Sequence, residues 1–407
     1  MSLSITKDRN FVIYMSGNTV SWVGSWMQRT SIGWLSWELT QSPSWVGLIA
    51  LAQYLPLTFV APIFGVLLDN ADRRRYAVSI QFILVILGIG LCLLQLSGLL
   101  TIYVLFAYCL LLGVVNSAYQ PVRLTLIHDI APPQLLTQAI GANSILFNMS
   151  RLIGPALGGV AIIAFGVGFT FLINACTHFV SFISLLVVKI RASKRKIQSA
   201  SFYEQFTEGL RYTLENHRIR ELLFLSMTVS LLARGVIELL PAFAGGEFES
   251  GSGGLAILMA AGGAGAIVAG MVLSRASNEQ RLLALVRIGC YGLGVSIAIF
   301  GVIGWYPAAV AMTVIIGALS TLSSVGMQAI LQSNIDSDFR GRVVGLWGMT
   351  SVAGPAIGGA LLGGLAQFTG LKTITFISGV LCALLCWRIL RGSKFFNRSS
   401  DSTHTSS

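Results

Sequence analysis

The feature that most constrains this chain is a series of apolar runs, each long enough to cross a lipid bilayer as a helix. The runs are continuous rather than alternating, and hydrocarbon offers no water to unpaired backbone groups, so helices are the expected spanning form. The sequence therefore predicts an all-α membrane protein with about twelve transmembrane helices. The runs lie at residues 10–37, 45–68, 76–96, 99–118, 138–165, 167–188, 219–243, 253–274, 281–304, 307–330, 342–367 and 371–390.

The composition fits a surface that faces hydrocarbon. Only 11% of the residues are charged and 54% are apolar, with a mean hydropathy of +0.76, whereas a soluble domain carries about 25% charged residues. A soluble enzyme is therefore excluded, and the short loops offer no nucleophile, base and orienting residue, so we expect no enzymatic activity. The six cysteines lie inside apolar runs without metal-ligand spacing, so we expect no metal, disulfide or cofactor.

The net charge of +11 arises from an uneven distribution of Lys and Arg. The odd-numbered connections, such as residues 38–44 and 245–254, hold none apart from Lys372, whereas the even-numbered connections and both tails are basic. Because Lys and Arg are retained on the cytoplasmic side of a membrane, this asymmetry predicts that both termini are cytoplasmic. It also explains the basic balance without a nucleic-acid partner; the bilayer itself is the expected partner.

An internal repeat divides the chain. The heptapeptide IGPALGG at residues 153–159 recurs as AGPAIGG at 353–359, each time in the fifth run of a six-run half. Between the halves lies a polar stretch in which Phe202, Phe206, Leu210 and Leu214 mark one face of an interfacial helix on the inner leaflet. We expect an N-terminal half at 1–188, a basic linker at 189–218, a C-terminal half at 219–391 and a polar tail at 392–407.

Several motifs together resemble a known family. GSWMQR at residues 24–29, ELTQSP at 38–43 and RLIGP at 151–155 resemble the major facilitator superfamily, and within it the bacterial drug and siderophore (enterobactin-type) exporter branch. The resemblance covers residues 10–390 and implies two pseudo-symmetric six-helix halves. It implies a monomeric secondary active transporter of the bacterial inner membrane, an antiporter that exchanges protons for a small drug-like molecule or siderophore by alternating access.

Two other functions stay open. One is a proton-coupled importer or symporter of a small metabolite, which the direction of transport would separate from an exporter. The other is a non-transporting membrane scaffold or sensor, which would tolerate neutralisation of the charges inside the spans. No Gly-x-x-x-x-Gly-Lys-Ser/Thr loop is present in the sequence, so the chain does not itself hydrolyse ATP.

A latch motif follows the second run. Gly65 and Asp69, followed by Arg73 and Arg74, resemble the family's Gly-x-x-x-Asp and basic cluster, which latches the inner face when the protein opens outward. Here Asn70 stands where the family usually has Arg, which weakens the internal pairing of that latch. The alternative is that these arginines only set topology by binding headgroups.

A second motif lies in the fifth run and resembles the antiporter signature of exporters. The resemblance implies that this run makes a sealed contact associated with export. The alternative is that small residues only bring two helices close together, and the second copy at 353–359 favours it. The motif comprises Gly141, Ser150, Arg151, Gly154, Pro155, Gly158 and Gly159.

Charged residues inside the spans are the remaining candidates, because a charge at the bilayer centre costs about 2.5–3.5 kcal/mol. Glu238 is the candidate proton carrier, and Arg234, four residues earlier, can pair with it; a permanent ion pair is the alternative. Gln28, Arg29 and Trp26 are the candidates for lining a substrate cavity, with structural pairing as the alternative.

Overall fold

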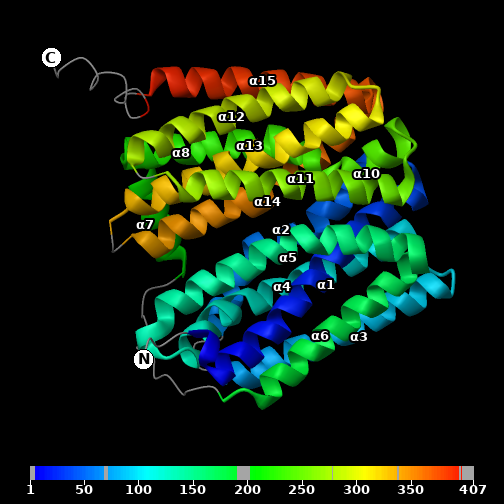
Figure 1. Ribbon diagram of the computed structural model, residues 1–407, viewed down its shortest axis with the longest axis vertical. Helices are drawn as coiled ribbons and strands as arrows, with labels where there is room; N and C mark the ends of the chain where they lie inside the picture. Colours follow the sequence, from blue (N-terminus) through cyan, green and yellow to red (C-terminus); the bar gives the residue numbers. More distant parts are fainter. Residues whose placement is uncertain are drawn as a thin grey trace. The chain divides into compact units, whose positions relative to one another are not determined.

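The computed structural model describes residues 5–67, 72–189, 202–276, 278–336, 339–393 and 396, which form helices and no strand. The all-α prediction is thus confirmed (Figure 1). The first part of the chain contains α1 (Arg9–Thr40), α2 (Pro43–Leu67), α3 (Arg73–Leu96), α4 (Ile102–Ile130), α5 (Leu136–Phe165) and α6 (Val167–Val187). The second contains α7 (Phe202–Glu215), α8 (His217–Thr228), η3 (Val229–Arg234), α9 (Gly235–Glu238), α10 (Leu240–Ala242), η4 (Phe243–Glu247), α11 (Gly251–Ser274), α12 (Glu279–Val302), α13 (Tyr306–Ser333), α14 (Arg340–Thr369) and α15 (Leu371–Gly392).

Among the described residues, ten helices are long and apolar enough to cross a membrane, and they coincide with the third to twelfth predicted runs. The first two runs coincide with α1 and α2, helices of 32 and 25 residues that are not among the ten. A total of about twelve spans therefore stays a prediction.

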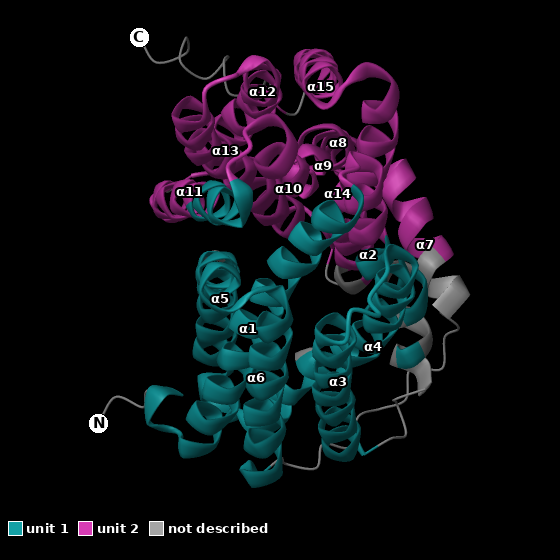
Figure 2. Cartoon of the chain, turned by 90° about the vertical axis from the view of Figure 1, so that its right-hand side faces the viewer, with its two compact units in different colours: residues 1–40, 52–199, 251–260 teal, residues 41–51, 200–250, 261–407 magenta. Residues whose placement is uncertain are grey.

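The chain forms two compact units (Figure 2). Unit 1 comprises residues 1–40, 52–199 and 251–260, and unit 2 comprises 41–51, 200–250 and 261–407. The first turns of α2 belong to unit 2, where the Ser44 hydroxyl donates to the Gly363 carbonyl of α14 at 2.9 Å. The first turns of α11 belong to unit 1, where Ala256 contacts Gly159 of α5. The domain limits expected at 188, 218 and 391 stay a prediction.

Corresponding turns join α5 to α6 in unit 1 and α14 to α15 in unit 2. Gly166 joins α5 to α6 with φ +80°, and Gly370 joins α14 to α15 with φ +84°. Only glycine adopts such a conformation at little cost. Inside unit 1, α1 packs on α5 and α6, and α3 packs on α4 and α6; inside unit 2, α12 packs on α13 and α15.

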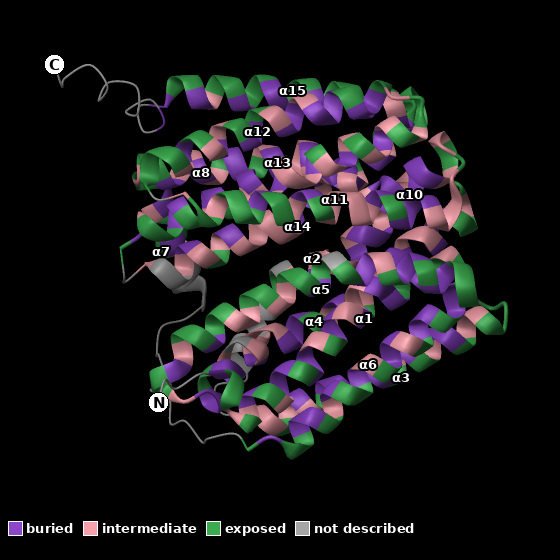
Figure 3. Cartoon of the chain, in the orientation of Figure 1, coloured by how far each residue is buried: buried purple, intermediate pink, exposed green. Residues whose placement is uncertain are grey.

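The helices keep large apolar side chains exposed on one side, as a surface that faces hydrocarbon requires (Figure 3). Leu93 on α3, Ile163 on α5 and Leu384 on α15 are examples. The opposite sides are buried among neighbouring helices.

Two predicted elements differ in the structure. The fourth run was expected to end near residue 118, but α4 continues to Ile130 through Pro121. Buried Val122, Leu126 and Ile130 prolong its apolar spacing, so packing outweighs the lost backbone bond. The seventh run, expected as one helix, is broken into α8, η3, α9, α10 and η4.

Linker helix α7 exposes Leu210 and Leu214, two members of the expected apolar face. Its opposite face binds the connection between α13 and α14 and the first turn of α14. The Tyr212 ring stacks on Phe339 at 4.3 Å, the Tyr212 hydroxyl donates to Asp336 at 2.9 Å, and Arg342 pairs with Glu208 at 2.7 Å.

Candidate functional site

The repeat in α5 brings that helix against α1. A Cβ atom at Gly154 would lie 2.5 Å from the Cβ of Trp26, and one at Gly158 would lie 3.1 Å from the Cγ of Met27. Small residues are therefore needed here because the two backbones nearly touch. Ser150 belongs to the same contact, since its hydroxyl donates to Leu146 at 2.8 Å and lies 3.4 Å from the Thr19 carbonyl.

The other members of the antiporter-like motif in α5 do not all lie in a close helix contact. Gly141 is exposed, and a Cβ atom there would meet nothing within 4 Å. Pro155 is buried inside α5. Close packing therefore accounts for Gly154, Gly158 and Gly159 but not for Gly141.

Trp26 of α1 and Arg151 of α5, predicted separately, meet in the structure. The guanidinium carbon of Arg151 lies 5.6 Å from the Trp26 ring centroid, and that of Arg29 lies 5.1 Å from it. Arg29 also lies 4.7 Å from the ring centroid of Tyr54 on α2. These are cation–π distances, each worth about 0.5–2 kcal/mol depending on solvent access.

Arg123 of α4 extends this group, although the predicted end of the fourth run at residue 118 leaves it in a connection. Its guanidinium carbon lies 5.3 Å from the ring centroid of Trp22 and 5.4 Å from that of Phe147. The rings of Trp22 and Phe147 pack edge to face at 5.2 Å. The apolar spacing beyond residue 118 was the signal that could have placed Arg123 on a helix.

We name these residues the aromatic–arginine cluster. Within unit 1 it joins three cations to four aromatic rings from helices α1, α2, α4 and α5, with Arg151 exposed and Arg29 half-buried. Its members are Trp22, Trp26, Tyr54, Phe147, Arg29, Arg123 and Arg151.

Gln28 has a different environment from its neighbours Trp26 and Arg29. It is 4% exposed, its amide nitrogen donates to the Tyr108 hydroxyl at 3.0 Å, and its amide oxygen accepts from Asn174 at 2.5 Å. The amide therefore joins α1 to α4 and α6. These two hydrogen bonds orient α1, the helix that carries Trp26 and Arg29.

Arg234 and Glu238 lie in unit 2, where the seventh span is irregular. Arg234 ends π-helical η3, Glu238 ends the short helix α9, and both are half-buried. A Cβ atom at Gly359 of α14 would lie 2.9 Å from the Cβ of Glu238. Glu238 thus packs on the second copy of the repeat, beside a π-helical turn of the kind often found at functional sites.

The two latch arginines in the described residues have internal partners. Arg73 pairs with Asp129 of α4 at 2.7 Å, and Arg74 donates to the Leu185 carbonyl of α6 at 3.1 Å and to that of Leu186. They connect the beginning of α3 to the ends of α4 and α6. These contacts come in addition to any effect of the two arginines on topology. Gly65 lies in α2, and Asp69 lies outside the described residues.

Comparison with known families gives the decisive observation: residues 3–404 match the family of major facilitator proteins described as transmembrane secretion effectors. The chain belongs to this family. It is thus a transporter of the major facilitator type and a multi-pass membrane protein.

The relatives of this chain include proteins that are named for export. The enterobactin exporter EntS of Salmonella choleraesuis is 25% identical over 82% of this chain and 81% of its own length. The macrolide efflux protein A of Streptococcus pyogenes is 21% identical over 93% of this chain and 94% of its own.

A solved structure supports the fold. The crystal structure of a bacterial homologue of the human lysosomal transporter Spinster, inward-facing and unoccupied, superposes with a TM-score of 0.76 at 14% identity. The match covers 97% of this chain and 99% of that one. At this identity the likeness concerns the fold alone, which is that of a major facilitator transporter.

Proposed function

We propose that this secretion effector is a proton-coupled exporter, an antiporter that works by alternating access, whose substrate is an organic anion with an aromatic ring. Siderophores and drug-like compounds include molecules of this class. The single observation that carries the proposal is the aromatic–arginine cluster of unit 1.

The chemistry of the cluster suits such a molecule. Guanidinium groups offer forked donors to carboxylate or phenolate oxygens, and the Trp26 and Phe147 rings offer faces for a flat substrate. Trp26 already packs against Phe147, with ring centroids 6.3 Å apart. In this proposal Arg29, Arg123 and Arg151 select the charge, Trp26 contacts the ring, and Gln28 positions α1.

Export is favoured over uptake by two considerations. Relatives are named for enterobactin export and macrolide efflux, and α5 carries the motif that resembles the antiporter signature. The distribution of Lys and Arg supports cytoplasmic termini in a bacterial inner membrane, where the chain works as a monomer.

Proton coupling is assigned to Glu238, with Arg234 as its changing partner. A carboxylate inside a membrane span is costly unless it is paired, so release from Arg234 favours proton uptake. The irregular geometry of η3 and α9 allows a small rearrangement to change that pairing. In the same cycle Gly65, Asp69, Arg73 and Arg74 latch the inner face when the transporter opens outward.

Reconstituted protein tests coupling. Proteoliposomes with an imposed pH gradient are assayed for transport of enterobactin and, in parallel, of a macrolide. We expect gradient-driven flux of enterobactin, the aromatic compound of the two, that Glu238→Gln makes independent of the gradient, whereas Glu249→Gln, an exposed change of the same kind, leaves it intact. Unchanged pH dependence in Glu238→Gln would remove Glu238 from the mechanism.

The cluster is tested in the same assay. Arg123→Gln should lower transport of an anionic aromatic substrate about tenfold, the value of one charge-assisted contact of about 1.5 kcal/mol. Trp26→Ala should lower it by up to about tenfold, because an aromatic contact is worth about 0.5–1.5 kcal/mol. Arg275→Gln is the matched control, since Arg275 is exposed after the last turn of α11. Equal flux in all variants contradicts the assigned substrate class, and no flux of any substrate in the parent protein favours a scaffold or sensor.

A further inference from the structure

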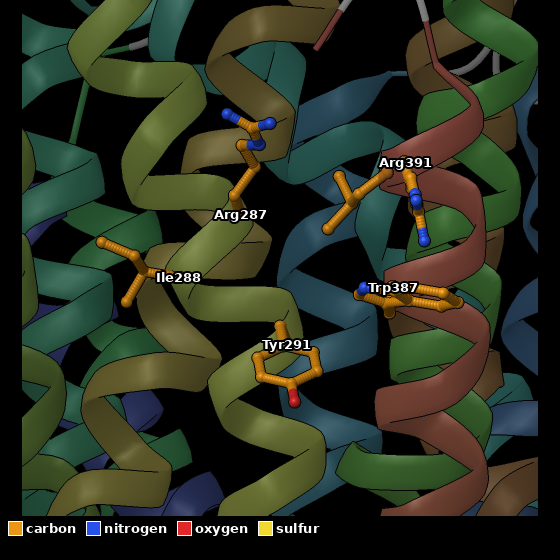
Figure 4. A pocket seen from close by; sticks show the side chains of 6 residues that line it. Arg287, Ile288, Tyr291, Trp387 and Arg391 are labelled. Atoms are coloured by element: carbon orange, nitrogen blue, oxygen red, sulfur yellow. The ribbon is translucent and has the colours of Figure 1, made fainter. Parts of the chain in front are cut away.

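An apolar groove lies between α12 and α15 on the exposed side of unit 2 (Figure 4). It consists of two adjoining hollows of about 390 and 490 Å³, and Tyr291 and Trp387 line both. The second hollow continues along the helices to Val302 and Phe376.

Close helix packing creates this groove. A Cβ atom at Gly294 would lie 2.6 Å from the backbone nitrogen of Ala383, and one at Gly301 would lie 2.6 Å from that of Phe376. The backbones of α12 and α15 therefore touch, with small side chains along the contact. The larger side chains of Ile299 and Leu384 rise on either side of it and are exposed.

One end of the groove is cationic. Arg287 lies four residues before Tyr291 on α12, and Arg391 lies four residues after Trp387 on α15. The guanidinium carbon of Arg391 lies 5.0 Å from the Trp387 ring centroid. Figure 4 shows both arginines on the same side of Tyr291 and Trp387, at the end where α12 begins and α15 ends. The residues that line the two hollows include these two cations and no acid.

We infer that this groove binds one anionic phospholipid of the phosphatidylglycerol type. Its phosphate binds between Arg287 and Arg391, and an acyl chain lies along the hollow from Tyr291 toward Val302. That part of α12 is about 17 Å long at 1.5 Å per residue, close to the roughly 15 Å depth of one leaflet. The charge and the length of the groove thus both match a lipid whose headgroup lies at the end where α12 begins.

The headgroup arm of the test uses native mass spectrometry of the detergent-purified chain, titrated with phosphatidylglycerol or with phosphatidylcholine of the same acyl chains. We expect phosphatidylglycerol to bind more tightly. Because each Arg near the surface contributes about fivefold to anionic-lipid affinity, Arg287→Ala with Arg391→Ala should weaken its binding roughly twenty-five-fold. Arg287→Lys with Arg391→Lys should keep most of the preference.

Arg388→Ala is the matched control, because Arg388 is an exposed cation of α15 that does not line the groove. It should leave binding unchanged, and equal elution volumes from size-exclusion chromatography establish that each variant folds. An unaltered preference in the double alanine variant, or an equal loss in Arg388→Ala, would overturn the proposal.

An acyl arm tests the groove itself. Val295→Trp places a large ring midway along the hollow and should lower the binding of both lipids at least fivefold. Undiminished binding of both lipids in this variant would place the lipid elsewhere and overturn the proposal as well.

Discussion

The two units place different chemistry at equivalent positions. In unit 1, Asn174 of α6 donates to the Gln28 side chain of α1, whereas in unit 2 Ser378 of α15 donates to the Leu232 carbonyl of η3 at 2.6 Å. Ser378 follows Asn174 in the sequence by the same number of residues as Leu232 follows Gln28. Gly370 follows Gly166 by this number too. The same helix contact is therefore made by a buried amide pair in one unit and by a π-helical backbone carbonyl in the other.

This difference parallels the division of labour in the proposed function. Unit 1 surrounds its amide pair with the aromatic–arginine cluster, and α1 remains a continuous helix. Unit 2 uses the backbone of a broken span, which carries Arg234 and Glu238. The proposed function assigns substrate selection to unit 1 and proton coupling to unit 2.

The largest expected effect concerns the two copies of the repeat. A Cβ atom at Gly358 of α14 would meet the Leu231 carbonyl oxygen and lie 2.9 Å from its Cα, whereas one at Gly158 of α5 meets Met27 at 3.1 Å or more. The Leu231 atoms lie well inside van der Waals distance of the added Cβ, whereas the Met27 atoms, two of the nearest three of them backbone, need to move by only a few tenths of an ångström. Gly358→Ala should therefore cost about 3 kcal/mol and Gly158→Ala about 1 kcal/mol. Thermal unfolding of the purified variants measures both losses of stability.

Gly141→Ala is the control, because a Cβ atom there meets open space. Equal destabilisation by Gly358→Ala and Gly158→Ala would show that the two copies are packed alike. A loss of transport in a fully stable Gly141→Ala would instead indicate a role beyond packing in the antiporter-like motif.

A smaller effect is expected from the ion pairs near the helix ends. Arg73 and Asp129 are 19% and 5% exposed, whereas Arg342 and Glu208 are 28% and 56% exposed. Breaking the first pair leaves a buried carboxylate, so Arg73→Ala should cost about 2 kcal/mol, and Arg342→Ala less than about 1 kcal/mol. A double-mutant cycle for each pair isolates the coupling energy, and a coupling at Arg342 as large as that at Arg73 would refute the ranking.

The smallest difference in stability loss between the units is expected at the two equivalent polar contacts. Gln28→Leu leaves the amide of Asn174 buried without its partner and should cost about 2 kcal/mol, whereas Ser378→Ala removes one hydroxyl bond worth about 1 kcal/mol. Pairing Gln28→Leu with Asn174→Leu should recover part of the loss, because both polar groups are then gone. If the double variant is as unstable as the sum of the two single ones, the amides do not act as a pair.

Much of the helical layout was readable from hydrophobic pattern. The runs at 138–165 and 371–390 agree closely with α5 and α15, since a continuous apolar segment in hydrocarbon has only the helix available. The repeat at 353–359 was equally plain. Pattern failed at Pro121 and at η3, where contacts with neighbouring helices decide whether a backbone bond is kept, lost or shifted.

The candidate site was only partly readable. Trp26 and Arg29 were predicted, with Gln28, to line a substrate cavity, and their three-residue spacing places them near each other on one helix. Arg123, Phe147 and Tyr54 come from other helices, and nothing in their local sequence indicates that they meet α1. Gln28 was predicted to line a cavity, yet its partners Tyr108 and Asn174 lie on α4 and α6.

The sequence by itself determined that this chain is an α-helical membrane protein with a repeated half, because apolar length and the distribution of Lys and Arg are local properties that the bilayer acts on directly. Only the tertiary structure decided which arginines meet which aromatic rings, where the seventh span breaks, and that α12 and α15 leave a groove. Those outcomes depend on side chains from separate helices competing for the same space, and no single segment carries that information.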